Sequence, residues 1–133
     1  PLANRVEAGK RPRSSMSPVM VFNKDGSLRL VVGSPGGSRI IDYVAQVVVG
    51  VLDWNLDAQT AINLPRITNR NNYTSLEKGT ELANAEADFV NRGHTVRILD
   101  LNSGLHAVEV KKGKLYGAAD PRREGIALSD KSH

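Results

Sequence analysis

The first part of the chain alternates between short apolar runs and turns rich in glycine, proline and small polar residues. Residues 18–22 and 28–32 are mostly apolar, and the segment between them contains the pair Asp25-Gly26. An Asp-Gly pair between two apolar runs is typical of a β-hairpin. We therefore predict a hairpin here, followed by a tight connection over residues 33–38, where glycine and proline accept backbone angles that other residues resist.

The next stretch, residues 38–54, carries apolar side chains at helical spacing, and its many β-branched residues favour a strand locally. Its length and period favour a helix, so we predict a largely buried helix that begins at an N-cap Ser38 and runs to about Trp54. The apolar positions that carry this prediction are Ile40, Ile41, Val44, Val47, Val48, Val51 and Leu52.

The second half of the chain predicts further helices and another hairpin. Asp57 is suited to cap a short helix that ends at Asn63, before Pro65. The other expectations are a surface loop over residues 67–74, an amphipathic helix over 80–92 ended by Gly93, a strand over 94–99, and a hairpin formed by 105–110 and 114–118. Hairpins exclude an all-parallel sheet, so the pattern predicts an α+β fold with helices packed on antiparallel sheets.

Composition adds several exclusions. The chain has 133 residues, 40% of them hydrophobic, which suits one globular domain. It contains no cysteine, so disulfides, thiolate nucleophiles and cysteine-based zinc sites are excluded. The spacing of His94, His106 and His133 matches no metal motif. We therefore expect no metal and no cofactor, and no apolar stretch is long enough for a membrane span.

Net charge is +4, and the clearest basic cluster consists of Lys10, Arg11 and Arg13. The cluster lacks aromatic platforms and a wider basic stripe, so we interpret it as a solvated loop and expect no nucleic-acid partner. The chain begins at Pro1, without an initiator methionine. This start leads us to expect a fragment or a processed product.

Two short segments are candidates for chemistry. Gly36 and Gly37 precede a predicted helix, and such a loop presents backbone N–H groups that bind phosphate, carboxylate or a developing oxyanion. Spacing alone predicts only a tight turn, and neither the Walker nor the dinucleotide pattern is met. Ser14 and Ser15 are paired hydroxyls that can donate to a carboxylate. Taken alone, they too indicate only a polar loop.

Together these segments resemble a known family. Residues 10–18, Lys-Arg-Pro-Arg-Ser-Ser-Met-Ser-Pro, resemble the Lys-Arg-Pro-x-Ser-Ser-Met-Ser-Pro motif of γ-glutamyltranspeptidases. Residues 33–40, Gly-Ser-Pro-Gly-Gly-Ser-Arg-Ile, resemble the next motif of that family. Residues 63–66 resemble its Ala-Pro-Arg region, with Leu64 in place of alanine, and residues 115–122 resemble its terminal Tyr-Gly-Ala-Ser-Asp-Pro-Arg.

The resemblance implies the αββα sandwich of N-terminal-nucleophile hydrolases, in which two antiparallel sheets lie between helical layers. It also implies a γ-glutamyltransferase or glutathione hydrolase, which passes the γ-glutamyl group of glutathione to water, amino acids or peptides through an acyl-enzyme on an N-terminal threonine. Gly36 and Gly37 match the oxyanion-hole glycines of the family. Ser14 and Ser15 match the serines that hold the donor's α-carboxylate, while Arg39 and Arg122 are expected to form structural ion pairs.

By the same resemblance, residues 1–133 form the C-terminal portion of a small subunit. The chain has no N-terminal threonine, so we expect no nucleophile in it and no activity of the isolated piece. The expected partners are γ-glutamyl compounds such as glutathione, the remainder of an autoprocessed small subunit and a large subunit. The family resemblance suggests the bacterial periplasm or exterior.

Two other functions remain open. A related acylase of the same fold would act on a glutaryl or poly-γ-glutamate substrate. A non-catalytic anion-binding module would use the glycine loop to hold phosphate or carboxylate. The residue that binds a substrate's α-amino group would distinguish the γ-glutamyltransferase from the related acylase, and it is expected outside this chain.

Overall fold

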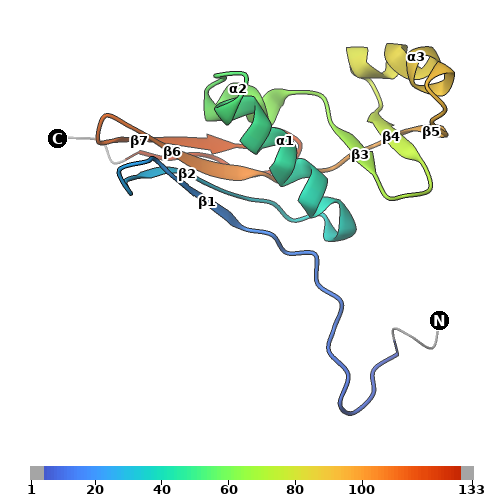
Figure 1. The fold of residues 1–133 in the computed structure, drawn as a ribbon, viewed down its shortest axis with the longest axis horizontal. Coiled ribbons are helices and arrows are strands. Elements are labelled where there is room, and N and C mark those ends of the chain that lie inside the picture. Colours follow the sequence, from blue (N-terminus) through green and yellow to red (C-terminus); the bar gives the residue numbers. More distant parts are fainter. Residues whose placement is uncertain (1–4, 130–133) are drawn as a thin grey trace.

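A computed structural model describes residues 5–129 of the chain, so Pro1 and His133 lie outside the described residues (Figure 1). Two sheets and three α-helices make up this part of the protein, together with 3₁₀ turns at Gly37–Arg39 and Glu81–Ala85. The elements in chain order are β1 (Val19–Phe22), β2 (Leu28–Gly33), α1 (Ile40–Leu52), α2 (Ala58–Asn63), β3 (Ile67–Asn69), β4 (Thr74–Glu77), α3 (Glu86–Asn91), β5 (Val96–Leu99), β6 (His106–Lys111) and β7 (Lys114–Ala119).

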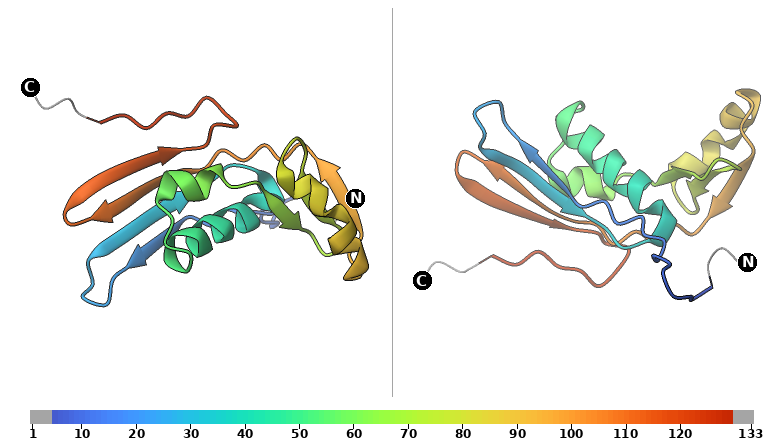
Figure 2. Two further views of the ribbon diagram at one scale, coloured as in Figure 1. Left: turned by 90° about the horizontal axis from the view of Figure 1, so that it is seen from above. Right: turned by 60° about the horizontal axis from the view of Figure 1, so that its bottom comes forward.

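The larger sheet has the strand order β1-β2-β6-β7, and every neighbouring pair is antiparallel. Helices α1 and α2 lie together on one face of this sheet (Figures 1 and 2). Alternate residues of the strands point toward these helices because side chains alternate between the two faces of a strand. The buried core between sheet and helices includes Leu30, Val32, Val44, Val47, Val51, Ala61, Ile62, Leu105, Ala107 and Ala118.

The opposite face of the larger sheet is apolar and largely open. Met20 pairs with Val31, and Val31 pairs with Val108, which places the three side chains in one row across the sheet. Met20 is 63% exposed and Val108 is 38% exposed. Residues 126–128 lie along part of this face and close a groove of about 340 Å³ with it (Figure 2). The remaining apolar surface has no cover from residues 5–129.

The predicted hairpins are confirmed, and so is the short helix α2, where the Asp57 side chain accepts a hydrogen bond from the Thr60 amide. The prediction that Ser38 caps the long helix is wrong. The chain enters α1 through the 3₁₀ turn Gly37–Arg39, and the residue in the N-cap position of α1 is Arg39, with no side-chain cap. Two glycines with positive φ start the turn before Ser38 is reached.

The surface loop predicted for residues 67–74 is confirmed at its centre, where residues 70–72 are exposed and outside any strand, and is wrong at both ends. The two ends of this segment form β3 and the start of β4, and Thr68 and Thr74 are buried. Together with β5 they form the smaller sheet, in which β3 and β4 are antiparallel whereas β4 and β5 are parallel. The polar composition concealed these strands because their burial depends on packing against distant segments, α1 among them.

The amphipathic helix predicted for residues 80–92 is shorter than expected. Only Glu86–Asn91 is α-helical, the preceding turn is 3₁₀, and neither element buries a residue. Gly93 ends the helix as predicted, with φ of 89°. The amides of Gly93 and His94 bond to the carbonyls of Val90 and Phe89, which is the Schellman arrangement. No helix among residues 5–129 has the length and apolarity that a membrane crossing requires.

Candidate functional site

The connection between β2 and α1 is a diglycine bend formed by Gly36 and Gly37. Their φ angles are 139° and 59°, both in the region that glycine tolerates better than other residues. Within residues 5–129 the two amide N–H groups donate to no protein acceptor, whereas the carbonyl oxygens of both glycines accept hydrogen bonds from the turn that follows. The bend therefore offers adjacent backbone donors that the fold itself does not use.

The inner and outer sides of the bend differ in packing. A Cβ atom at Gly36 would lie 2.8 Å from Tyr43 Cε2, and the Tyr43 ring is buried beneath it. A Cβ atom at Gly37 would meet nothing within 4 Å. The bend is thus supported from inside by an aromatic ring and is open on the side of Gly37, where another molecule can approach.

The bend stands at the positive end of a helix. The 3₁₀ turn runs directly into α1, which has 13 residues, so the dipoles of the aligned peptides favour a negative charge here. Arg39 adds a positive side chain at the same end of α1. The ion pair predicted for Arg39 is not present among residues 5–129, and its Nε is buried without a hydrogen-bond partner there.

Ser14 and Ser15 approach the same end of the larger sheet. Val19 at the start of β1 pairs with Val32 near the end of β2, so the residues before Val19 and those after Val32 leave the sheet together. Ser15 is half-buried, and the exposed Ser14 hydroxyl accepts a hydrogen bond of 3.3 Å from the amide two residues later. The paired serines precede β1 and the diglycine bend follows β2, so both segments leave the larger sheet at the same end.

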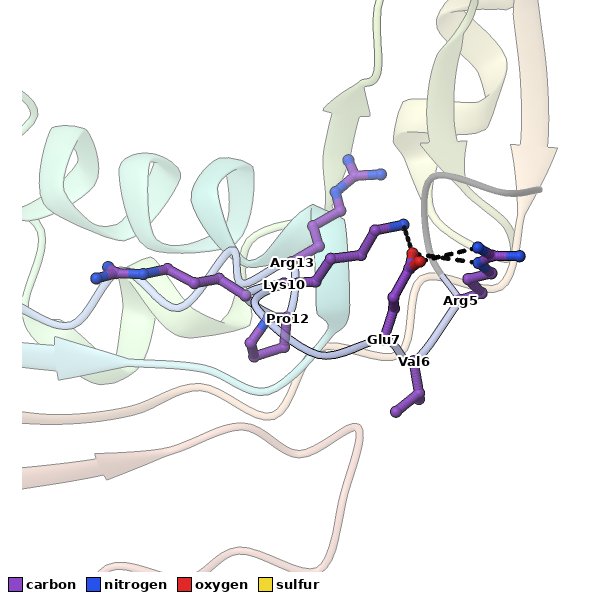
Figure 3. Close-up of a pocket in the computed structure, with 7 residues that line it drawn as sticks. Arg5, Val6, Glu7, Lys10, Pro12 and Arg13 are labelled. Carbon is purple, nitrogen blue, oxygen red and sulfur yellow. Dashed lines mark hydrogen bonds and ion pairs between the residues drawn. The ribbon is translucent and has the colours of Figure 1, made fainter.

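The segment before these serines is basic and folds back on itself (Figure 3). Glu7 accepts from Arg5 at 2.9 Å and pairs with Lys10 at 3.1 Å, around a pocket of about 340 Å³. The hydrogen bond from Arg5, with that from Lys10, lowers the pKa of Glu7. Arg11 and Arg13 also line this pocket, so the surroundings of Ser14 carry positive charge that favours an anionic ligand.

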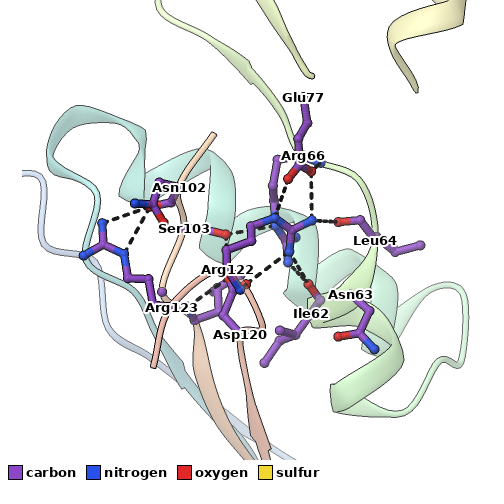
Figure 4. A network of polar contacts seen from close by, with 12 residues as sticks. Ile62, Asn63, Leu64, Arg66, Glu77, Asn102, Ser103, Asp120, Arg122 and Arg123 are labelled. Carbon is purple, nitrogen blue, oxygen red and sulfur yellow. Dashed lines mark hydrogen bonds and ion pairs between the residues drawn. The ribbon is translucent and has the colours of Figure 1, made fainter. Parts of the chain in front are cut away.

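Arg122 forms the ion pairs predicted for it and occupies the centre of a polar network (Figure 4). Its guanidinium donates to both carboxylate oxygens of Glu77, to Asp120 Oδ1 at 3.1 Å, and to the carbonyl oxygens of Ile62 and Leu64. One side chain therefore joins the end of α2, strand β4 and the segment after β7. It holds the two sheets to the same helix.

Arg66 lies beside Arg122 and is completely buried. It donates to Ser103 Oγ at 3.2 Å, to Gln46 Oε1 at 3.2 Å and to the Ile62 carbonyl. Burial, together with the nearby Arg122 charge, lowers the pKa of Arg66 to about 10, so the side chain remains charged at neutral pH. Asp120 and Glu77 compensate this buried positive charge.

Sequence reasoning placed Arg122 and Asp120 in a matched motif but gave no role to Ser103 or Glu77. No local pattern identifies these two residues, because their partners are far away in the sequence. Among residues 5–129, no group of three or more histidine and carboxylate side chains is arranged to hold a metal ion. His94 bonds to Thr74 Oγ1 at 2.9 Å, which gives it a structural role.

The family model described as gamma-glutamyltranspeptidase matches residues 1–129 of the chain. The chain belongs to the γ-glutamyltranspeptidase family. The glutathione hydrolase proenzyme of Escherichia coli (strain K12) is 42% identical over 126 residues, covering 90% of this chain and 21% of the relative. The acylase ACY 1 proenzyme of Pseudomonas sp. (strain SE83) is 33% identical, covering 93% of this chain and 22% of the relative. The chain thus spans about a fifth of the length of these relatives.

Solved structures agree with this membership. A mutant γ-glutamyltranspeptidase from Helicobacter pylori matches with a TM-score of 0.80 and 36% identity, over 91% of this chain and 68% of that chain. The transpeptidase CapD of Bacillus anthracis matches with a TM-score of 0.76 and 27% identity, over 93% of this chain and 75% of that chain. The predicted fold class is confirmed: this γ-glutamyltranspeptidase chain is α+β and forms part of an N-terminal-nucleophile hydrolase fold.

Proposed function

We propose that this chain is the C-terminal portion of the small subunit of a γ-glutamyltransferase or glutathione hydrolase. It supplies the oxyanion hole through Gly36 and Gly37, and it supplies the α-carboxylate site through Ser14 and Ser15. The observation that carries the proposal is the pair of amides at the diglycine bend that donate to no acceptor among the described residues. The bend follows β2, and the paired serines precede the neighbouring strand β1. Its membership of the family supports the reaction class.

The proposed reaction starts with attack of an N-terminal threonine, outside residues 1–133, on the γ-glutamyl carbonyl. As the carbonyl carbon becomes tetrahedral, its oxygen becomes negative and accepts from the amides of Gly36 and Gly37. Donors that are already oriented stabilise this charge without reorganising, and losing one such donor typically slows catalysis by about 10²–10³-fold. The α-carboxylate, held by Ser14 and Ser15, keeps the carbonyl positioned for attack. Collapse of the tetrahedral species breaks the C–N bond, releases the donor's amine with a proton and leaves the glutamyl group as an ester on the threonine. Water, an amino acid or a peptide then attacks this ester, takes the glutamyl group and frees the threonine hydroxyl.

The open face of the larger sheet supports the proposed partners. Its exposed apolar residues, Met20 and Val108 among them, suit burial against a second sheet, as the sandwich of this fold requires. The remainder of the small subunit and a large subunit would supply that cover, and the proenzyme relatives support autoprocessing. By the same kinship the complete enzyme would reside in the bacterial periplasm or exterior. Residues 1–133 alone would be inactive. An assay for release of a chromophore from a γ-glutamyl anilide tests this expectation.

A second candidate function is acyl transfer on another substrate. An acylase, ACY 1 proenzyme, and a transpeptidase, CapD, are among the similar proteins, which supports a second acyl-transfer activity. For that activity we propose a glutaryl or poly-γ-glutamate substrate at the same site. A non-catalytic module that binds phosphate or carboxylate at the bend is the third possibility. Comparing binding of glutamate with binding of inorganic phosphate separates this module from the enzymes.

The carboxylate site is tested in the complete enzyme, meaning this chain with the rest of its small subunit and a large subunit. Replacing Ser14 and Ser15 by alanine should raise KM for γ-glutamyl anilide by roughly 10-fold or more, since hydrogen bonds to a charged group contribute about 1.5–3 kcal/mol. A 4-aminobutanoyl anilide, which lacks the α-carboxylate, is the control donor, and its KM should change little in the same variant. An equal loss for both donors would contradict the assignment.

A further inference from the structure

Ser34 connects the diglycine bend to a distant segment of the chain. Its hydroxyl donates to the carbonyl oxygen of Pro35 at 2.7 Å and accepts from the Gly104 amide at 3.3 Å. Gly104 lies 70 positions later in the sequence, in the segment that leads into β6. A single half-buried hydroxyl therefore fixes the direction of the Pro35 carbonyl by reference to the larger sheet.

The Pro35 carbonyl belongs to the same peptide unit as the Gly36 amide. A peptide unit is planar, and in the trans form its N–H points opposite to its C=O. No peptide bond among residues 5–129 is cis. A hydroxyl that holds the Pro35 oxygen toward Ser34 consequently turns the Gly36 N–H away from Ser34. That N–H donates to no acceptor within the described part of the chain.

We propose that Ser34 is a positioning residue that aims the Gly36 N–H at the developing oxyanion. The inference rests on the proposed function, because it assigns a role toward a charge that forms only in that reaction. Ser34 does not touch the substrate in this account. It acts through the Pro35–Gly36 peptide, whose orientation would otherwise depend on a bend with two flexible glycines.

The anchor of Ser34 is itself rigid. A Cβ atom at Gly104 would lie 2.7 Å from Pro35 Cγ and 2.8 Å from Arg123 Cδ, so this segment packs tightly against the bend. The residues on both sides of Gly104 are held by Asp120, which accepts from the Ser103 hydroxyl and the Leu105 amide. The Asp120 amide also donates to the Leu105 carbonyl at 2.8 Å.

These contacts form one continuous path. Asp120, which is 1% exposed, holds the segment around Gly104, and the Gly104 amide holds the Ser34 hydroxyl. That hydroxyl in turn holds the peptide that carries the Gly36 donor. The motif Asp-Pro-Arg at residues 120–122 thereby contributes to the geometry of the bend without being part of it.

The test uses Ser34→Ala and Ser34→Thr in the complete enzyme, with rates expressed per titrated active site. Ser34→Ala should lower the acylation rate for γ-glutamyl anilide by roughly 10-fold or more, with KM within about twofold, since misaimed groups lose rate rather than binding. A γ-boronic acid analogue of glutamate forms a tetrahedral anion on the nucleophile, so its affinity should fall by the same factor. Affinity for glutamate itself should not change. Ser34→Thr keeps the hydroxyl and should restore both values.

Three further variants keep the outcome interpretable. Ser27→Ala removes a serine hydroxyl that bonds locally to Asp25 in the β1–β2 turn, and it should leave all values unchanged. Gly104→Ala forces a Cβ against Pro35 and should reproduce the loss of boronate affinity if Ser34→Ala does not yield folded enzyme. Unchanged boronate affinity in Ser34→Ala or Gly104→Ala would overturn the inference, provided that Gly37→Asn lowers it. If Gly37→Asn also has no effect, the oxyanion assignment itself fails.

Discussion

The Tyr43 ring lies directly beneath Gly36, with Cε2 at 2.8 Å from the position that a Cβ would take. Tyr43 is 2% exposed and belongs to the core between α1 and the larger sheet, so the ring has little room to move. The backbone of the bend is therefore in contact with the hydrophobic core. This contact explains why a glycine is needed at position 36 for packing as well as for its φ of 139°.

Gly36→Ala should accordingly impair the complete enzyme in two ways. The new methyl group displaces either the bend or the Tyr43 ring, and overpacking of this kind typically costs about 1–3 kcal/mol. We expect a lower thermal midpoint together with loss of acylation. The matched control is Gly33→Ala, at the end of β2, where a Cβ meets nothing within 4 Å. Equal effects of the two substitutions would contradict this account of the packing.

Neighbouring arginines provide a second prediction. Arg122→Ala leaves Glu77 and Asp120 buried without their main cationic partner, and breaking a buried pair in this way costs about 3–5 kcal/mol, or somewhat less here because Arg122 is partly exposed. Arg123→Ala removes an exposed side chain that bonds only to the Asn102 carbonyl among the described residues. Thermal unfolding should show a large drop for Arg122→Ala and a small one for Arg123→Ala. Similar midpoints for both variants would contradict a structural role for the network.

Two buried threonines of the smaller sheet should respond oppositely to valine. Thr68 Oγ1 is buried without a hydrogen-bond partner, so Thr68→Val removes an unsatisfied polar atom and should stabilise the protein by roughly 1 kcal/mol. Thr74 Oγ1 bonds to Asn69 and His94, so Thr74→Val should destabilise it. The comparison of thermal midpoints decides the point. A destabilising Thr68→Val would indicate a partner for this hydroxyl in the complete protein.

Acid should weaken the network around Asp120. Burial alone raises the pKa of this carboxyl, but the hydrogen bonds from Ser103, Arg122 and Leu105 outweigh it and leave the pKa below its ordinary value. A depressed folded-state pKa contributes stability above the unfolded value of about 3.9 and loses it as pH falls through the folded value. The thermal midpoint should therefore decline as the pH falls below about 4. This decline should be less steep in Asp120→Asn than in Asp100→Asn, which changes an exposed carboxylate and serves as the control. Identical slopes would contradict this.

The sequence predicts those elements whose signals are local. The Asp25-Gly26 pair marks the first hairpin, and Asp57 marks the start of α2, because turn and cap chemistry depends on a few neighbouring residues. Strands β3 and β4 were missed because Thr68, Ser75 and their neighbours are buried by distant packing despite being polar. Burial of that kind leaves no periodic pattern.

The residues of the candidate site likewise fall into those that local motifs reveal and those that only the fold brings together. Gly36, Gly37, Ser14 and Ser15 lie in short motifs and were identified from them, although their roles remain predictions. The Ser34–Gly104 contact joins residues that are 70 positions apart, so no local spacing points to it. The network around Arg122 joins three separate parts of the chain, and Leu64, Asp120 and Arg122 lie in motifs whereas Glu77 does not.

The most direct test of the oxyanion assignment is the acylation rate of Gly37→Asn in the complete enzyme, compared with Gly26→Asn. Both glycines have positive φ and free space around a new Cβ, and asparagine tolerates such angles, so both variants should fold. The Gly37→Asn side chain occupies the open side of the bend. We predict that its single-turnover acylation falls about 10²-fold or more while Gly26→Asn stays unchanged. Equal acylation rates in the two variants would contradict the account.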